Sequence, residues 1–179
     1  MKIRTHSVEE TKSVAEAFAA VLRPNDLVVL TGELGGGKTA FVQGACVGLG
    51  ISEQVTSPTY AIVQEYSAAT PVQHLDVYRL NSVTELIDLG FTEMIDSGCI
   101  MFMEWGERVE SALPADHIVV RIGMPDGDDI GDTERIVGIA AHGSHAIARA
   151  HEIAISLAHY LHPESVDIVE RSPMSTDSH

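Results

Sequence analysis

One stretch decides the fold of this 179-residue chain: Leu27-Val28-Val29-Leu30-Thr31-Gly32-Glu33-Leu34-Gly35-Gly36-Gly37-Lys38-Thr39. It begins with a continuous apolar run, which is typical of a strand buried on both faces of a sheet. Its second part matches G-x-x-x-x-G-K-S/T, the phosphate-binding loop between a strand and a helix. The spacing from Lys38 to Leu49 predicts that helix, and Gly48 and Gly50 are suited to end it. Strand, glycine-rich loop and helix in this order indicate an α/β fold.

The loop has the residue types that a nucleotide phosphate needs. Successive backbone N–H groups of a glycine-rich loop donate to phosphate oxygens, and three consecutive glycines remove side chains that would block the approach. Lys38 can reach the β- and γ-phosphates, and the hydroxyl of Thr39 can join the coordination shell of Mg²⁺. The N-K-x-D motif that reads guanine is absent, which favours ATP over GTP. We therefore predict an ATP-binding site made of Gly32, Glu33, Leu34, Gly35, Gly36, Gly37, Lys38 and Thr39, in which Thr39 also binds Mg²⁺.

Helical and strand patterns continue on both sides of this stretch. Helices are expected at roughly 8–22, 38–49, 82–90, 91–96, 108–113 and 144–161. Strands are expected at 27–30, 61–66, 72–78, 99–103, 117–122 and 134–140. Because the later strands follow one another too closely for helical crossovers, part of the sheet must be antiparallel. The prediction is an α/β fold with a P-loop NTPase-like mixed β-sheet, a parallel core with antiparallel strands, flanked by helices. Residues 1–162 are expected to form a single P-loop ATPase domain, and 163–179 a polar, disordered tail.

The composition excludes several classes of protein. Hydrophobic residues make up 45% of the chain, which excludes a disordered protein. The net charge of −15 argues against strong, direct binding to nucleic acid, because phosphate binding needs a basic face. Two cysteines are too few for a disulfide framework. No apolar run approaches the roughly 18 residues of a membrane helix, and the N-terminus lacks the apolar stretch of a signal peptide, so we expect a cytoplasmic protein with no membrane contact.

An acidic residue at the end of an apolar run is a candidate metal ligand. Glu104 follows the run 100–103, and in this fold a carboxylate at the end of such a strand lies beside the phosphate-binding loop. The alternative is an ordinary surface acid at a strand end. Glu107 is a second candidate, but it lies beyond the strand. The sequence therefore favours Glu104, together with Thr39, as the ligands of Mg²⁺.

A second acid, Asp76, lies on a strand with alternating polar and apolar residues. His74 and Tyr78 share its face of that strand. A carboxylate there can orient an attacking water or bind a metal through water. The alternative interpretations are a salt bridge with Arg79 and a solvated strand face. Residue spacing alone leaves these possibilities open.

Four segments together resemble one family: Gly32–Thr39, Thr56-Ser57-Pro58-Thr59-Tyr60, His74-Leu75-Asp76-Val77-Tyr78-Arg79-Leu80 and Glu104-Trp105. In order and spacing they are similar to the TsaE (YjeE) family, the bacterial P-loop ATPases of tRNA threonylcarbamoyladenosine (t6A) biosynthesis. The resemblance covers about residues 5–160. It implies two partner proteins, TsaD and TsaB, which transfer the threonylcarbamoyl group to the tRNA. It also implies an ATPase that is slow alone and that drives turnover of the TsaD–TsaB complex without performing the transfer.

The resemblance also implies roles for particular residues. Thr39 and Glu104 would ligate Mg²⁺, and Asp76, with Lys38 and Glu104, would carry hydrolysis. The segment 56–60 would be a switch-like loop that senses the γ-phosphate, and Trp105 would lie beside the metal-binding carboxylate. Thr5 and Arg135 align loosely with nucleotide contacts at the two ends of the family.

Two other functions stay open at this point. One is a small-molecule kinase that uses the same loop. Such kinases usually carry an arginine-rich lid, whereas the eight arginines of this chain are scattered singly. The other is a nucleotide-gated binding module without significant turnover. Incubation with acceptor molecules tests the first, and phosphate release tests the second.

Overall fold

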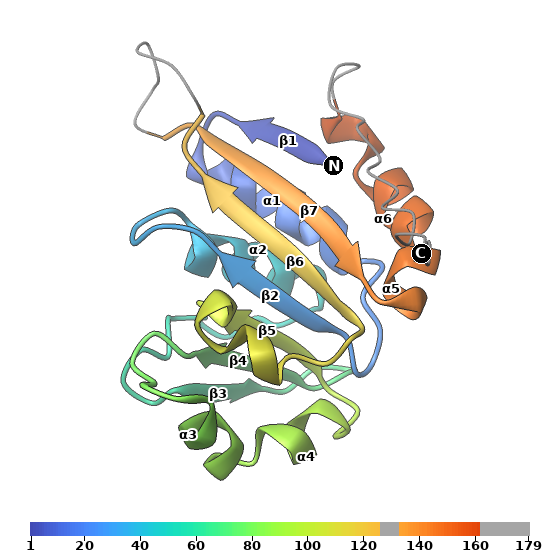
Figure 1. Ribbon diagram of the computed structural model, residues 1–179. Helices are drawn as coiled ribbons and strands as arrows, with labels where there is room; N and C mark the ends of the chain where they lie inside the picture. Colours follow the sequence, from blue (N-terminus) through green and yellow to red (C-terminus); the bar gives the residue numbers. More distant parts are fainter. Residues whose placement is uncertain (126–132, 162–179) are drawn as a thin grey trace, which may run out of the picture.

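The computed structural model describes residues 1–125 and 133–161, and the predicted tail at 163–179 lies outside them. In this part of the chain, seven strands form one sheet with the order β1-β7-β6-β2-β5-β4-β3 (Figure 1). The strands are β1 (Lys2–Thr5), β2 (Leu27–Thr31), β3 (Val63–Tyr66), β4 (Val72–Asp76), β5 (Ile100–Glu104), β6 (His117–Gly123) and β7 (Arg135–His142). The helices are α1 (Val8–Ala19), α2 (Lys38–Gly48), α3 (Val83–Asp88), α4 (Phe91–Ile95), α5 (Ser144–Ala148) and α6 (Ala150–Ser156). Two 3₁₀ segments are η1 (Gly106–Ala112) and η2 (Ala158–Tyr160).

The centre of the sheet is parallel and its edges are antiparallel. Strand β2 pairs in parallel with β5 on one side and with β6 on the other, and β5 pairs in parallel with β4. The pairs β6–β7, β1–β7 and β3–β4 are antiparallel. This confirms the predicted mixed sheet with a parallel core. The carboxyl ends of β2, β4 and β5 consequently lie at one edge of the sheet, which is where ligands bind in open α/β folds.

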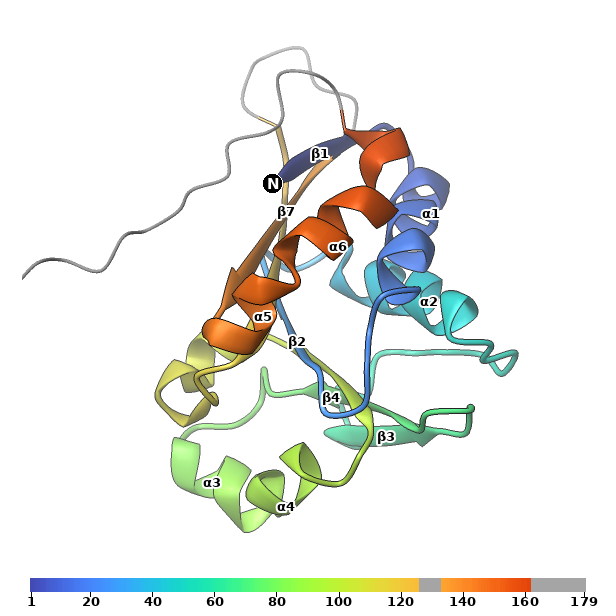
Figure 2. The same ribbon diagram turned by 90° about the vertical axis from the view of Figure 1, so that its right-hand side faces the viewer.

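Helices cover both faces of the sheet, so β2 is buried from both sides. Val28 and Leu30 pack with α1, α2 and α6 on one face, while Leu27 and Val29 pack with α3, α4 and η1 on the other. Figure 2 shows these two layers of helices around the sheet. The continuous apolar run of β2 therefore follows from its central place, because a strand with helices on both faces has no solvated side.

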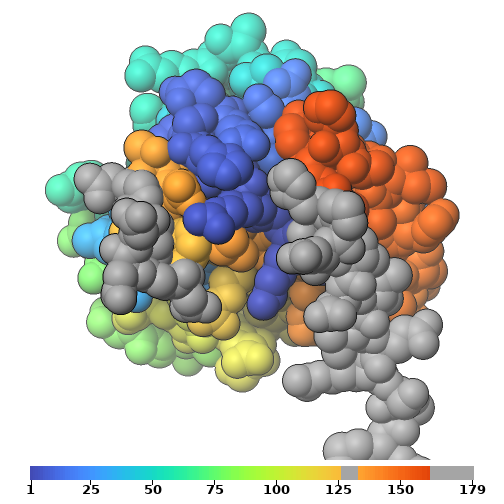
Figure 3. Space-filling view, turned by 90° about the horizontal axis from the view of Figure 1, so that it is seen from above, coloured from blue at the N-terminus to red at the C-terminus, as the bar shows by residue number. Residues whose placement is uncertain are grey.

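The N-terminal and C-terminal elements lie side by side. Strand β1 pairs with β7, and α6 packs against α1, as the space-filling view also shows (Figure 3). Strand β1 was not predicted from the sequence, because its four residues include only two inward side chains and so give a weak periodic signal. None of the helices in 1–125 and 133–161 has the length and apolarity needed to cross a lipid bilayer.

The prediction of one continuous helix at 144–161 is wrong. The cap residue is Gly143, and the segment divides into α5, α6 and η2. The break lies at Arg149, whose guanidinium binds the Asp26 carboxylate and the Val21 carbonyl, both more than 120 positions away in sequence. Because α5 ends there, the apolar residues of 144–161 do not form one continuous buried face, and Ile147 is 59% exposed.

Candidate nucleotide-binding site

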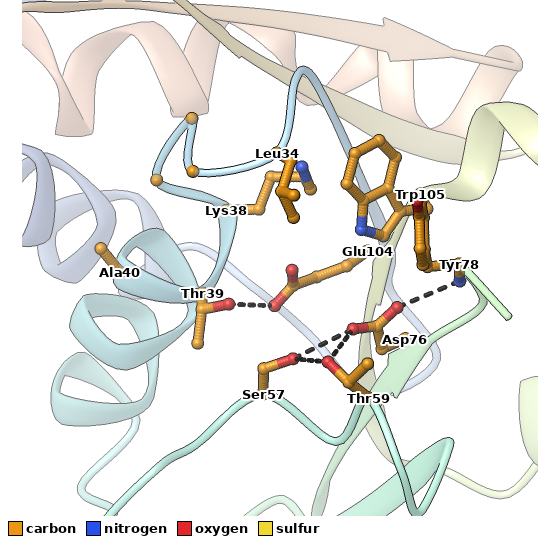
Figure 4. A pocket seen from close by; sticks show the side chains of 13 residues that line it. Leu34, Lys38, Thr39, Ala40, Ser57, Thr59, Asp76, Tyr78, Glu104 and Trp105 are labelled. Carbon is orange, nitrogen blue, oxygen red and sulfur yellow. Dashed lines mark hydrogen bonds between the residues drawn. The ribbon is translucent and has the colours of Figure 1, made fainter.

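A cavity of about 430 Å³ opens at the carboxyl edge of the parallel strands (Figure 4). Three groups of residues line it: the loop and first turn of α2 (34–40), Ser57 and Thr59 from the loop after α2, and Asp76, Tyr78, Glu104 and Trp105 from the ends of β4 and β5. The structure therefore brings most of the predicted site residues together around one cavity. Their closeness follows from the parallel pairing of β2 with β5 and of β5 with β4.

The conformation of the loop requires glycine at Gly32 and Gly36. Gly32 has a φ of 134°, and a Cβ atom there would lie 2.0 Å from the Ile122 carbonyl oxygen. At Gly36, a Cβ atom would lie 2.9 Å from the Glu33 carbonyl oxygen. A side chain at Gly32 would therefore collide with the backbone of β6, and one at Gly36 would collide with the backbone of the loop itself. The glycines thus allow the tight turn that directs backbone N–H groups toward the cavity.

Alanine at Gly32 is expected to destabilise the fold more than alanine at Gly35. Gly35 has a φ of 74° but open space around its Cβ position, so Gly35→Ala should cost only the backbone strain of about 1–3 kcal/mol. Gly32→Ala adds a collision with the backbone of Ile122 and should lower the free energy of unfolding further. Denaturant titration of both variants measures the difference, and equal losses would contradict this description of the loop.

Lys38 holds a positive charge at the loop. Its Nζ donates hydrogen bonds to the carbonyl oxygens of Gly32 (2.8 Å) and Glu33 (2.9 Å) and lies 3.5 Å from the centroid of the Trp105 ring. Trp105 has a φ of 66°, an uncommon backbone conformation for a residue with a side chain. Burial lowers the pKa of Lys38, while Glu104 and nearby acids act in the opposite direction. The ammonium group is therefore fixed beside the cavity between loop carbonyls and an aromatic face.

Thr39 and Glu104 are in direct contact. The Thr39 hydroxyl donates a hydrogen bond of 2.8 Å to Oε1 of Glu104. Glu104 is only 3% exposed, so it is not the surface acid of the alternative interpretation. Glu107 is exposed, lies in η1 and does not line the cavity, although its charge acts on Lys38. Hydroxyl and carboxylate oxygens are the kind of ligand that Mg²⁺ prefers, and this pair supplies both from adjacent elements.

Asp76 is buried and held by hydroxyl groups. Its Oδ2 accepts hydrogen bonds from Ser57 Oγ (3.0 Å) and Thr59 Oγ1 (2.8 Å), and its Oδ1 accepts one from the Tyr78 backbone N–H (3.0 Å). Asp76 is 3% exposed, and Arg79 instead places its guanidinium over the ring of Tyr60. Neither a solvated face nor a salt bridge with Arg79 describes this carboxylate, so both alternative interpretations are wrong.

The two remaining predicted nucleotide contacts have different surroundings. Thr5 is fully buried, its hydroxyl lies 2.8 Å from that of Thr11, and it does not line the cavity. Arg135 begins β7 and donates from Nε to the Gly36 carbonyl oxygen at 3.0 Å. The structure therefore brings Arg135 to the backbone of the loop but does not bring Thr5 to the cavity.

Two further residues that contact the site, Tyr78 and His74, have no site role predicted from the sequence. Tyr78 lines the cavity, and its ring lies 4.9 Å from that of Trp105. His74 is buried and does not line the cavity, but its Nε2 lies 2.9 Å from Oε1 of Glu104. The alternation along β4 put both on the face of Asp76, but it gave no information about their partners on β5.

Comparisons with known proteins point to one family. The family model "Threonylcarbamoyl adenosine biosynthesis protein TsaE" matches residues 5–132. A Bacillus subtilis protein named tRNA threonylcarbamoyladenosine biosynthesis protein TsaE is 38% identical over 145 residues, or 80% of this chain and 87% of that protein. A Treponema pallidum protein of the same name is 36% identical over 129 residues, or 72% of this chain and 96% of that protein. The crystal structure of Bacillus subtilis YdiB superimposes with a TM-score of 0.73 at 33% identity, covering 87% of this chain and 94% of that one.

Proposed function

Because the chain belongs to the TsaE family, we propose that it acts in tRNA threonylcarbamoyladenosine biosynthesis as the component that binds and hydrolyses ATP. In this proposal ATP hydrolysis drives turnover of a TsaD–TsaB complex, and the chain does not itself transfer the threonylcarbamoyl group. The observation that carries the proposal is the direct contact between Thr39 and Glu104 in a cavity that also contains Asp76 and the glycine-rich loop.

Nucleotide binding uses the loop and Lys38. The backbone N–H groups of Gly35 and of 37–39 donate to phosphate oxygens at the start of α2, where the helix dipole also favours negative charge. The N–H of Gly36 instead closes the turn of the loop by donating to the Glu33 carbonyl oxygen at 3.0 Å. The ammonium group of Lys38 turns from the loop carbonyls to the β- and γ-phosphates. The chain carries a net charge of −15, which repels a negatively charged polyphosphate. The positive charge of Lys38 beside the cavity offsets part of this repulsion.

Thr39 and Glu104 fit a magnesium ion. Within the described residues no cluster of three or more His, Cys, Asp or Glu side chains is arranged to hold a metal. Mg²⁺ is commonly bound by one or two carboxylates together with substrate phosphates and water, so one carboxylate and one hydroxyl beside a phosphate cradle suit it. When bound, Mg²⁺ would neutralise charge that develops on the phosphates during hydrolysis.

Asp76 is the residue proposed to position the attacking water. Its carboxylate lines the cavity and can accept a hydrogen bond from water while Ser57 and Thr59 hold it in place. These two hydroxyl groups belong to the loop 56–60, so any movement of that loop changes the hydrogen bonds of Asp76. This coupling gives the loop a means to respond to the γ-phosphate.

The magnesium ligands are tested by Thr39→Ala and Glu104→Gln. Both variants are expected to raise the Mg²⁺ concentration needed for half of its effect on ADP binding by about tenfold or more, because Thr39→Ala removes a ligand oxygen and Glu104→Gln removes the negative charge of the carboxylate. Calorimetric titrations of ADP over a series of Mg²⁺ concentrations measure this. Glu110→Gln changes an exposed acid of η1 that does not line the cavity, and it should leave the magnesium dependence at the parent value. A parent-like magnesium dependence in both site variants would refute the assignment.

A small-molecule kinase is the second candidate function that uses this loop. Among the described residues that line the cavity none is an arginine, which disfavours phosphoryl transfer to an acceptor. Incubation with ATP, Mg²⁺ and a set of nucleosides and nucleotides distinguishes the two functions. We expect ADP and inorganic phosphate with unchanged acceptors. A phosphorylated acceptor formed in proportion to ADP would favour the kinase.

A further inference from the structure

A buried histidine lies against the proposed metal ligand. His74 is on β4, is fully buried, and places Nε2 2.9 Å from Oε1 of Glu104. An ionised carboxylate can only accept hydrogen bonds, so Nε2 carries the proton and donates. The other ring nitrogen, Nδ1, is buried and has no hydrogen-bond partner among the described residues. A buried nitrogen without a partner destabilises the fold, so packing alone does not account for histidine at this position.

The register of the sheet places Glu104 and Asp76 opposite one another. The two residues are partners in the parallel pairing of β4 with β5, and like charges directly opposite on neighbouring strands repel. Each carboxylate has its own donors. Asp76 accepts from the loop hydroxyls and from a backbone N–H. Glu104 accepts from Thr39 and His74, and both of these donors meet the same oxygen, Oε1.

We propose that His74 is a positioning residue for the metal site. By holding Oε1 of Glu104 through this hydrogen bond, it keeps the carboxylate from rotating toward or away from Asp76. The second oxygen, Oε2, then stays directed to the Lys38 side of the cavity (Figure 4). Such supporting hydrogen bonds commonly change metal affinity by about 10–100-fold. The inference rests on the proposed function, because it assigns a support to the carboxylate proposed to bind Mg²⁺.

His74→Gln and His74→Asn test this role because they differ by one methylene. The amide nitrogen of glutamine can occupy the position of Nε2, whereas that of asparagine lies near Nδ1 and does not reach Glu104. Mg²⁺ is expected to change the affinity for ADP, and the measured quantity is the Mg²⁺ concentration that gives half of this change. We expect His74→Asn to raise that concentration by about tenfold or more. His74→Gln should restore a value close to that of the parent. ADP affinity without Mg²⁺ should be the same in all three proteins.

Leu75→Ala is the control for a general weakening of β4. Leu75 packs in the apolar cluster on the opposite face of the sheet, so its truncation should lower the melting temperature without changing the magnesium dependence. The inference is overturned if His74→Asn and His74→Gln bind Mg²⁺ alike, or if Leu75→Ala gives the same shift. A parent without any magnesium dependence would instead refute the proposed metal site itself.

A spectroscopic measurement on the parent protein is independent of whether the variants fold. Nitrogen-15 NMR of the histidine side chains is expected to show the His74 proton on Nε2, with Nδ1 unprotonated. A neutral ring with its proton on Nδ1 would leave no donor toward Glu104 and would overturn the inference.

Discussion

Lys38→Ala is expected to weaken ATP binding by at least about 10–100-fold, because hydrogen bonds between charged groups contribute about 1.5–3 kcal/mol. The substitution removes the ammonium group that lies beside the cavity and leaves the carboxylates of Glu104 and Asp76 facing the phosphates without it. Repulsion from these acids should add to the loss. Calorimetric titration with ATP in the presence of Mg²⁺ measures the affinity directly.

The control for this prediction is Lys2→Ala. Lys2 is exposed on β1 and does not line the cavity, so its removal changes the net charge by the same amount without touching the site. Since Lys38 also donates to two carbonyl oxygens of the loop, circular dichroism should be recorded to confirm that the variant is folded. An ATP affinity close to that of the parent in folded Lys38→Ala would refute the nucleotide-binding site described above.

Asp76→Ala is expected to retain ATP binding and to lower the rate of hydrolysis by at least about 100-fold, the usual scale for a positioned acid–base group. Binding should persist because the loop and Lys38 remain in place. Asp76→Asn distinguishes a catalytic role of Asp76 from a role in anchoring the loop 56–60. Asparagine keeps an oxygen that can accept a hydrogen bond from Ser57 or Thr59, but it loses the negative charge. We expect Asp76→Asn to be as inactive as Asp76→Ala. Recovery of hydrolysis in Asp76→Asn would mean that the residue only anchors the loop.

Phosphate release and ATP binding must be measured on the same preparations of these variants. Asp88→Ala replaces an exposed acid on α3 and should leave both quantities unchanged. Unchanged hydrolysis in Asp76→Ala would give this residue a structural role only. Loss of both binding and fold would show that β4 requires the hydrogen bonds of Asp76, and Asp76→Asn would then decide the catalytic role.

Local patterns were sufficient to predict the parts of the fold that form the site. The apolar run of β2 and the glycines after it specify a strand and a turn without reference to the rest of the chain. The contact between Thr39 and Glu104 spans 65 positions, yet it was predictable because parallel strands bring their carboxyl ends to one edge of the sheet. The comparisons with known proteins confirmed the family that four short segments had indicated.

Features that depend on distant partners were not predictable from local patterns. Strand β1 is stabilised by its pairing with β7, and its four residues carry little signal alone. The C-terminal helix is interrupted where Arg149 binds Asp26, 123 positions earlier. The contact of His74 with Glu104 required the register of two strands, which periodicity does not give. The buried contact of Thr5 with Thr11 spans only six positions, but it was not predicted either, because a sequence pattern shows which residues are inward and not what they touch.

The rate of phosphate release with and without TsaD–TsaB tests the proposed function most directly. The protein, ATP and Mg²⁺ should release phosphate slowly, and addition of the TsaD–TsaB complex from the same organism should raise the rate severalfold or more. Asp76→Ala should show no such increase although it still binds ATP. Equal rates with and without the complex, or phosphate release that is independent of Asp76, would contradict the proposal that this chain is the ATPase that drives turnover of TsaD–TsaB.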